Sequence, residues 1–432
     1  MTVKRKALVL GAYGLIGAAC CRALLAAGFE VTGVGRSART AQRVLPGLPW
    51  VTADLARPLD WAGLVAGYDV VINASGALQD GLRDDLETIH VTALSNLVSV
   101  LEGSDTRLVH ISAAGVSEGS ETEFFRSKAR GDAVLKASNV DFIILRPTLV
   151  IGPDAYGGTA LLRATAGIPL VEPVVMPDAR VSCVALEDVA GAVVQAAEGG
   201  IATGTIADLT EAESRDFPKT VTILRNWLGF EPWSRRLRVP GVVLQGIGFG
   251  ADLLGWLGWR SPLRTTAIRQ LQSGIEGDPE PWRRAGGRDC ATLPQILARM
   301  TPTRQERLFA RMWVMTPVTV AILALFWITS GLIGFAQRDV AAEVLTSRGF
   351  GLTSAMSFVL IGAAIDLGLG LAILWRAAAQ WACLGMIAVS LGYLGAGTLM
   401  TPDLWADPLG PFVKVLPGIA LALTGYILLE ER

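Results

Sequence analysis

Three glycines near the start of the chain have the spacing of a phosphate-binding turn. The motif Gly11-Ala-Tyr-Gly14-Leu-Ile-Gly17 follows the apolar run Lys6–Leu10 and opens an Ala- and Leu-rich stretch. Glycines let the backbone approach a pyrophosphate, and the N-terminus of the following helix supplies N–H groups and partial positive charge. A preceding strand and a following helix distinguish this motif from a turn that binds nothing. We therefore predict dinucleotide binding by Gly11, Tyr13, Gly14, Leu15, Ile16 and Gly17.

The end of the second predicted strand carries arginine where an NAD-specific site would offer a carboxylate. The segment reads Gly35-Arg36-Ser37-Ala38-Arg39. A guanidinium at this point pairs with a ribose 2′-phosphate, whereas Asp or Glu binds the free ribose hydroxyls. The sequence therefore predicts that NADP(H) is preferred over NAD(H), with Arg36 as a cofactor-binding residue. The alternative is that Arg36 and Arg39 are only solvated surface charges.

Two further strand ends resemble those of a known family. Ala53-Asp54-Leu55 follows the third predicted strand and Asn73-Ala-Ser-Gly76 the fourth. With the glycine spacing, they resemble the extended and atypical short-chain dehydrogenase/reductase families over residues 6 to about 210. The resemblance implies that Asp54 lies beside the adenine and that Ala74, Ser75 and Gly76 line the back wall of the cofactor site.

Two later motifs narrow this resemblance. Leu145-Arg146-Pro147 and Ile151-Gly152-Pro153 are similar to the NmrA-like group, which includes the nucleotide-binding accessory subunit of respiratory complex I. The apolar C-terminal region is similar to bacterial fusions that carry a DoxX-like membrane domain.

The same resemblance implies a catalytic Ser, Tyr and Lys, of which one is missing. Ser112 occupies the serine position and Lys128 the lysine position, but Phe124 stands where the tyrosine is expected. Phenylalanine has no ionisable proton, so it cannot exchange one with a substrate. Tyr156 is a candidate substitute donor or simply a residue of the pocket rim, and Ser112 with a water is another. Lys128 keeps an implied role without catalysis, as a hydrogen-bond donor to the nicotinamide ribose; His90 and His110 are assigned no role.

Composition limits the classes of protein to which the chain can belong. At 432 residues, two or three structural units are expected, and 51% hydrophobic residues exceed the share in most soluble enzymes. A net charge of −1 provides no basic surface for nucleic acid. The five cysteines form no C-x-x-C pair, so neither a metal site nor a disulfide framework is expected.

Strand-like and helix-like runs alternate in the first half of the chain. Strands are expected at 6–10, 29–34, 50–52, 70–73, 107–112 and 142–145, and helices between them include 88–102 and 126–137. This alternation predicts an α/β fold, a doubly wound parallel Rossmann sheet that binds ligands at the carboxyl ends of its strands. We expect a Rossmann core at 1–150, the remaining sheet with a small substrate or lid subdomain at 151–300, and an all-α membrane domain at 312–432.

The membrane domain is expected to contain four transmembrane helices. Candidate spans are 312–335, 350–374, 381–400 and 412–429, each near the ~20 residues that cross ~30 Å of hydrocarbon. Basic residues precede the first span and Arg376 lies in the second loop, so the positive-inside rule places both termini in the cytoplasm of a bacterial-type inner membrane. The glycine-interrupted run 239–259 is expected to lie at the membrane surface or to be buried rather than to span.

These features lead to a functional hypothesis with two rivals. The leading hypothesis is a membrane-anchored NAD(P)H-dependent oxidoreductase that acts on a lipid- or quinone-like substrate from the bilayer. The first rival is a catalytically impaired NADPH sensor or an assembly factor for a membrane complex, because Phe124 replaces the tyrosine. The second rival is a nucleotide-regulated transporter, which depends only on Asp366 in the second span.

Overall fold

The first half of the chain forms the parallel sheet that the alternation of strands and helices predicts. The computed structural model describes residues 4–77, 85–155, 157–259, 261, 263–408 and 410–430. A seven-stranded parallel sheet has the order β11-β6-β5-β4-β1-β2-β3. Its strands are β1 (Lys6–Leu10), β2 (Glu30–Gly35), β3 (Trp50–Thr52), β4 (Val70–Asn73), β5 (Arg107–Ile111), β6 (Phe142–Pro147) and β11 (Thr205–Leu209).

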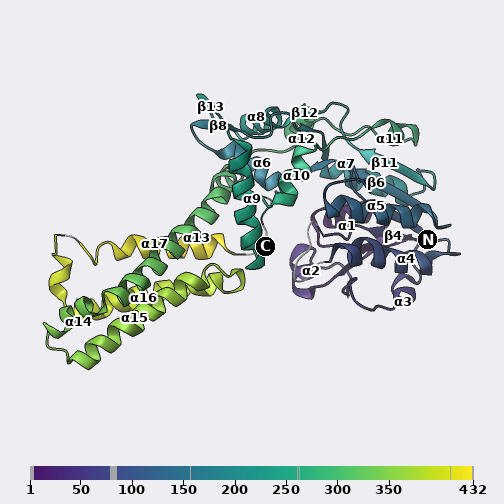
Figure 1. Ribbon diagram of the computed structural model, residues 1–432. Coiled ribbons are helices and arrows are strands. Elements are labelled where there is room, and N and C mark those ends of the chain that lie inside the picture. Colours follow the sequence, from purple (N-terminus) through teal and green to yellow (C-terminus); the bar gives the residue numbers. More distant parts are fainter. Residues whose placement is uncertain are drawn as a thin grey trace. The chain divides into compact units, whose positions relative to one another are not determined.

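Helices cover both faces of this sheet (Figure 1). Side chains alternate along a strand, so Ala7 and Val9 of β1 face one core, and Leu8 and Leu10 face the other. The first core includes α1 (Leu15–Ala26) and α7 (Leu186–Ala197), and the second includes α3 (Trp61–Val65), α4 (Ala93–Leu101) and α5 (Glu123–Lys136). Burial on both faces explains why the strands are almost continuously apolar.

The other elements before residue 300 complete this part of the chain. They are α2 (Ala38–Val44), η1 (Thr88–Thr92), β7 (Leu149–Ile151), α6 (Gly158–Gly167), β8 (Val171–Val174), β9 (Arg180–Val181), β10 (Cys183–Ala185), β12 (Arg215–Asp216), α8 (Phe217–Trp227), β13 (Arg235–Arg238), α9 (Gly241–Trp256), α10 (Thr265–Gln272), α11 (Glu280–Arg284) and α12 (Leu293–Arg299). The longest of them, α9, has 16 residues and ends in the second unit, which is described below. The expected helix 88–102 begins with η1, a π-helical turn, before α4. β11 lies in a region for which the sequence analysis expects no strand.

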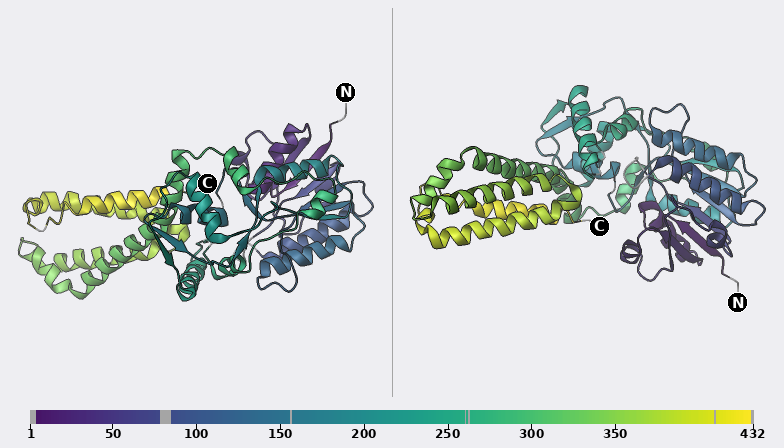
Figure 2. Two further views of the ribbon diagram at one scale, coloured as in Figure 1. Left: turned by 90° about the horizontal axis from the view of Figure 1, so that it is seen from above. Right: turned by 60° about the horizontal axis from the view of Figure 1, so that its bottom comes forward.

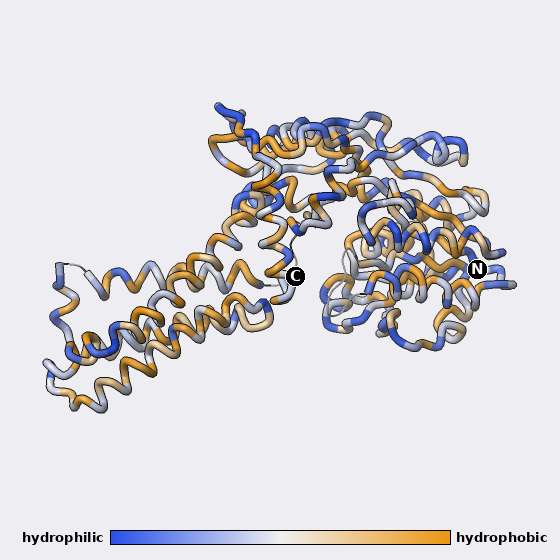
Figure 3. The backbone as a smooth tube through the Cα atoms, in the orientation of Figure 1, coloured by the Kyte–Doolittle hydropathy of each residue, from blue (hydrophilic) through white to orange (hydrophobic). Residues whose placement is uncertain are grey.

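The chain divides into two compact units, Met1–Gly248 with Pro262–Arg307 and Phe249–Ser261 with Leu308–Arg432. The second unit is helical. Its elements are α13 (Arg304–Ala336), which begins in the first unit, α14 (Arg338–Thr346), α15 (Leu352–Ala372), α16 (Arg376–Met400), η2 (Pro402–Trp405) and α17 (Val415–Leu428). The long helices run lengthwise beside one another (Figure 2) and are hydrophobic along most of their length (Figure 3).

Among the described residues, three helices are long and apolar enough to cross a membrane: α13, α15 and α16. The helix at the fourth expected span, α17, has only 14 residues. It is shorter than the ~20 residues of a full crossing, because residues 411–414 form turns rather than helix. The expectation of a helix over 412–429 is therefore corrected to Val415–Leu428.

Small residues and one polar cluster fix the packing of these helices. A Cβ on Gly331 of α13 would lie 2.7 Å from the Ala363 carbonyl oxygen of α15, so glycine permits this close approach. Asp366 of α15 is buried and accepts hydrogen bonds from Ser330 Oγ of α13 at 2.7 Å and from Tyr393 Oη of α16 at 3.4 Å. Asp366 therefore links the three long helices, and these contacts give its buried carboxylate two hydrogen-bond donors.

Candidate nucleotide-binding and active site

The glycine turn lies between β1 and α1, where the sequence analysis expects it. Gly11 has φ +72°, and a Cβ there would meet the Ala74 carbonyl oxygen at 2.8 Å. A Cβ on Gly17 would lie 2.2 Å from the Gly11 carbonyl oxygen. Both positions therefore require glycine because backbone packs on backbone. Gly14 is the N-cap of α1 and has no side chain to cover the first N–H groups, which leaves that helix terminus accessible to a phosphate.

The carboxyl ends of β1, β2 and β3 bring three predicted cofactor residues to one edge of the sheet. Arg36 directly follows β2 and is exposed, and Asp54 follows β3. Tyr13 lies over the end of β2: its hydroxyl accepts a hydrogen bond from the Arg36 backbone N–H at 3.1 Å. A Cβ on Gly35 would meet the Tyr13 ring at 2.3 Å, so this arrangement requires glycine. The Asp54 carboxylate accepts a hydrogen bond from the Ala56 N–H at 3.2 Å.

Residues 74–77 directly follow β4 and are called the wall segment below. Asn73, a buried residue that is not among the predicted site residues, holds this segment in place. Asn73 Oδ1 accepts hydrogen bonds from the Ser75 N–H at 3.2 Å and from the Ser75 hydroxyl. Asn73 Nδ2 bonds to His110 Nδ1 at 3.2 Å, and both side chains are buried. Burial holds the pKa of His110 well below its usual value, so this ring is a neutral acceptor inside the core. The sequence signal for this role was Asn73 itself, an amide residue at the end of the otherwise apolar strand β4.

Lys128 contacts the end of β5 at the residue before Ser112. Lys128 Nζ donates a hydrogen bond to the carbonyl oxygen of Ile111, which precedes Ser112, at 3.0 Å. Ser112 is 4% exposed, and its Oγ has no hydrogen-bond partner among the described residues. A buried hydroxyl without a partner is costly unless a ligand supplies one. The end of β5 thus carries a buried hydroxyl that lacks a described partner and, one residue earlier, a carbonyl oxygen that a buried ammonium group contacts.

Burial lowers the pKa of Lys128 to about 8, and the nearby Asp132 carboxylate opposes this shift. The ammonium form therefore predominates below about pH 8 and is lost as the pH rises through that value. We expect the affinity for NADPH to fall above about pH 8, because the neutral amine attracts the cofactor less. Calorimetry across pH 6–10 with the parent and Lys128→Gln tests this; a parent profile that matches the variant would contradict it.

Phe124 and His90 occupy the region where a catalytic tyrosine is expected. Phe124 lies in the first turn of α5, its ring centroid 5.8 Å from that of His90 and 5.9 Å from Lys128 Nζ. His90 is buried, and Nε2 accepts a hydrogen bond from the Ala77 N–H at 3.3 Å. Nδ1 must then carry the proton, and it donates to Ser127 Oγ at 2.8 Å. Tyr156, the candidate substitute donor, lies outside the described residues.

Burial and the charge of Lys128 lower the pKa of His90 to about 2. The ring is therefore neutral near pH 7 and serves as a positioning residue that joins the wall segment at Ala77 to α5. We expect His90→Ala to lower the free energy of unfolding by ~2–4 kcal/mol, because it leaves a cavity, an unsatisfied N–H donor at Ala77 and an unsatisfied hydroxyl acceptor at Ser127. Hydrogen exchange at the Ala77 amide should accelerate. Ser99→Ala, an exposed change on α4, is the control, and unchanged exchange at Ala77 would refute this role.

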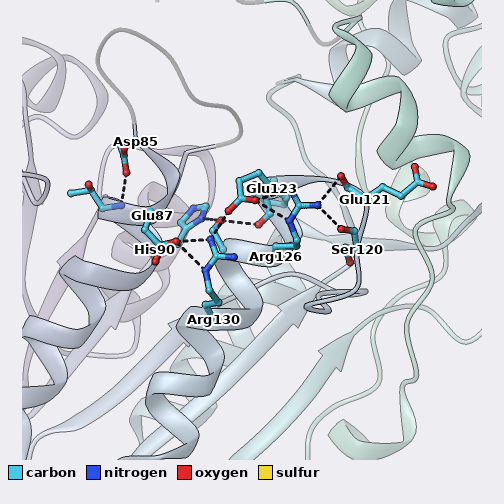
Figure 4. A network of polar contacts seen from close by, with 11 residues as sticks. Asp85, Glu87, His90, Ser120, Glu121, Glu123, Arg126 and Arg130 are labelled. Carbon is cyan, nitrogen blue, oxygen red and sulfur yellow. Dashed lines mark hydrogen bonds and ion pairs between the residues drawn. The ribbon is translucent and has the colours of Figure 1, made fainter.

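An ion-pair network joins α5 to η1 beside this site (Figure 4). Arg130 pairs with Glu87 at 2.5 Å and with Glu123, and Arg126 pairs with Glu123 at 2.8 Å. The hydrogen bonds from the two arginines lower the pKa of Glu123. These side chains are partly exposed, so each pair stabilises only weakly, but together they hold the first turn of α5 against the start of η1.

A parallel sheet of this order with a glycine turn after β1 defines a Rossmann-type nucleotide-binding fold. Comparison with protein families identifies the two parts of the chain: residues 11–198 match an NAD(P)H-binding family, and residues 324–423 match the DoxX-like family. The chain is thus a fusion of an NAD(P)H-binding domain with a DoxX-like domain, which confirms the resemblance drawn from its motifs at this level.

Two characterised bacterial proteins are similar to part of the chain. The ceramide reductase of Caulobacter vibrioides is 23% identical over 199 residues, 45% of this chain and 62% of that protein. The 2-alkyl-3-oxoalkanoate reductase of Shewanella oneidensis is 28% identical over 176 residues, 34% of this chain and 45% of that protein. The chain therefore matches less than two thirds of the length of either relative.

Solved structures agree on the fold. WbmH of Bordetella bronchiseptica, in complex with NAD+, has a TM-score of 0.51 at 18% identity and covers 68% of this chain and 96% of its own. A short-chain dehydrogenase/reductase superfamily protein of Agrobacterium tumefaciens with bound NAD has a TM-score of 0.51 at 14% identity. The match covers 72% of this chain and 98% of that protein. These likenesses show that the first part of the chain shares the Rossmann-type fold of these proteins.

Proposed function

We propose that this protein is a membrane-anchored NAD(P)H-dependent oxidoreductase that reduces a carbonyl group of a lipid- or quinone-like substrate. The observation that carries the proposal is the buried hydroxyl of Ser112, which has no hydrogen-bond partner among the described residues and directly follows the residue that Lys128 contacts. The matched relatives support this substrate class, since one is named for a ceramide, a lipid, and the other for a 2-alkyl-3-oxoalkanoate.

The residues at the sheet edge fit a dinucleotide. The N-terminus of α1 would bind the pyrophosphate, Asp54 would lie by the adenine, and the segment from Ala74 to Gly76 would form the back wall. When bound, the reduced nicotinamide supplies a hydride. Ser112 Oγ would donate a hydrogen bond to the substrate oxygen, and Lys128 would bind the nicotinamide ribose and bring positive charge to the developing oxyanion. The proton that converts the alkoxide to the alcohol would come from water through the Ser112 hydroxyl.

Cofactor choice and topology are parts of the same proposal. Arg36, exposed at the end of β2, would pair with a 2′-phosphate and favour NADPH over NADH. The basic residues ahead of the first span would keep the nucleotide domain in the cytoplasm. The short helix α17 would return the C-terminus to the same side, because the Leu429 carbonyl oxygen accepts a hydrogen bond from Arg376 at the start of α16, at 2.9 Å. Three helices that can cross the bilayer then keep this domain beside a membrane that carries the substrate.

The proposal is tested with the full chain in nanodiscs. Calorimetry compares NADPH and NADH for the parent and Arg36→Asp, and NADPH oxidation is followed with short-chain quinones and with a 3-oxo lipid. We expect NADPH to bind the parent more tightly and Arg36→Asp to remove that preference. Oxidation that depends on an added acceptor would support the reductase, and absence of binding would refute the nucleotide site.

One observation favours a second candidate, a nucleotide-dependent sensor or assembly factor. Phe124 removes the usual proton donor, while the glycine turn and Lys128 retain the means of binding. Tight NADPH binding without oxidation would favour this candidate. So would a cellular function that survives Ser112→Ala and fails with Gly14→Ala.

A further inference from the structure

Helix α9 exposes large apolar side chains along one of its sides. Val242 is 78% exposed, Phe249 71% and Trp256 84%. The other exposed apolar residues of the helix and its end are Val243, Ile247, Leu253, Leu254 and Leu257. At about 100° per residue these eight side chains fall within roughly half of the helix circumference. A contiguous apolar face of this size on a protein surface marks a binding surface.

The opposite side of α9 packs against other residues of the chain. Leu244 and Ala251 are each 8% exposed. A Cβ on Gly248 would lie 2.9 Å from the Thr265 side chain and 3.2 Å from Ile268, both in α10. The exposed face is therefore not needed for packing on the chain's own described residues.

The end of α9 belongs to the membrane unit, where it contacts the connection between α15 and α16. The Arg376 N–H donates to the Leu257 carbonyl oxygen at 3.0 Å, and Trp259 Nε1 donates to the Leu374 carbonyl oxygen at 2.6 Å. The Arg376 guanidinium lies 5.6 Å from the centroid of the Trp259 ring. This connection is where two apolar helices end, and tryptophan and arginine are the residues enriched at that depth of a bilayer. The contacts therefore hold the end of α9 at the level where α15 ends and α16 begins.

Basic side chains precede α9. Strand β13 reads Arg-Arg-Leu-Arg and all four residues are exposed. Arg236 pairs with Glu172 at 2.7 Å; Arg235 precedes it in the strand, and Arg238 follows two residues later. A basic segment adjoining an apolar surface is attracted to anionic headgroups.

We propose that α9 lies in the headgroup region of the bilayer, with its exposed apolar face in lipid and with Arg235 and Arg238 on anionic headgroups. A bilayer fits better than a second copy of the chain, because the apolar face continues into an end attached to a membrane-spanning unit and adjoins a basic strand that would repel its own copy. The helix does not cross the bilayer, since 16 residues extend ~24 Å, short of ~30 Å of hydrocarbon. The proposal is independent of the reductase chemistry.

The test uses two cysteine variants of the full chain that should not disturb folding. No described atom lies within 4 Å of a Cβ built on Gly246 or on Gly250, and both positions fall within the exposed face. Gly246→Cys and Gly250→Cys are labelled with an environment-sensitive fluorophore and reconstituted in phosphatidylcholine vesicles, with and without phosphatidylglycerol. Lipids brominated near the headgroup or near the chain end then report depth. Asp105→Cys, exposed on the first unit, is the aqueous control, and Leu325→Cys, 66% exposed in α13, is the bilayer-centre control.

We expect both α9 probes to shift to shorter emission wavelengths and to be quenched more by bromine near the headgroup than near the chain end. Phosphatidylglycerol should increase this quenching, and Arg235→Gln with Arg238→Gln should remove that increase. Emission like that of the Asp105→Cys probe would overturn the proposal. So would quenching that is strongest with bromine near the end of the lipid chain, as expected for Leu325→Cys. A shift that depends on protein density and shows no bromine quenching would instead identify a second copy as the occupant. The unsubstituted chain, in which Cys290 is only partly buried, gives the labelling background.

Discussion

Replacing Gly14 with alanine is expected to weaken NADPH binding by about tenfold or more, ~1.4 kcal/mol, while the first unit stays folded. Gly14 has φ −69°, which alanine adopts without strain. A Cβ there would meet only the Gly11 carbonyl oxygen, at 3.2 Å, so small backbone shifts accommodate the methyl group. That methyl group would, however, cover the N-cap of α1, where the backbone has to approach the pyrophosphate. Calorimetry on the full chain in nanodiscs, with circular dichroism of the same sample, measures both quantities.

Two matched substitutions separate binding from folding. Gly17→Ala places a methyl group 2.2 Å from the Gly11 carbonyl oxygen, so it should unfold the turn and lower stability as well as binding. Gly191→Ala lies on an exposed position of α7, with no described atom within 4 Å of its Cβ, and should leave both unchanged or raise stability slightly. NADPH binding by Gly14→Ala as tight as that of the parent would show that this turn does not contact the cofactor.

The sequence predicted the parts of the fold that depend on local patterns. Apolar runs followed by glycine or polar residues located six of the strands in the seven-stranded sheet, together with the turn from Gly11 to Gly17. The missed strand β11 reads Thr-Ile-Ala-Asp-Leu, and its Asp208 interrupts the apolar run. Burial raises the pKa of this carboxyl, and it accepts a hydrogen bond from the Asp278 N–H at 3.1 Å. That partner is distant in sequence, so no local pattern could reveal it.

Contacts between residues distant in sequence also limited the prediction of the candidate site. Ser112 and Lys128 could be aligned with a family motif, but the role of His90 depends on a π-helical turn and on two partners, Ala77 and Ser127, from other segments. A sequence pattern places a histidine on a helix; it does not determine which ring nitrogen accepts a hydrogen bond. The exposed face of α9 was likewise ambiguous, because its apolar residues occur all around the helix and only the structure separates the packed side from the open side.

Introducing the missing phenol should raise turnover. Position 124 lies in the first turn of α5, four residues before Lys128, so a tyrosine hydroxyl there would stand on the same helix face as the ammonium. A neighbouring positive charge lowers a phenol pKa, and a positioned acid contributes ~10²–10⁴-fold to a proton-transfer step. We therefore expect Phe124→Tyr to increase kcat for a carbonyl substrate by about 10²-fold with little change in NADPH affinity.

Three controls show whether such a gain reflects acid catalysis. Phe124→Leu tests whether removal of the ring itself matters, and the double variant Phe124→Tyr/Lys128→Met should lose most of the gain, because the phenol then has no ammonium beside it. The kcat of Phe124→Tyr should also fall at high pH as its phenol ionises, a transition that Phe124→Leu cannot show. If kcat instead stays at the parent value in a folded, NADPH-binding Phe124→Tyr variant, the site lacks a substrate carbonyl within reach of position 124. The nucleotide-dependent sensor would then become the better account of the protein.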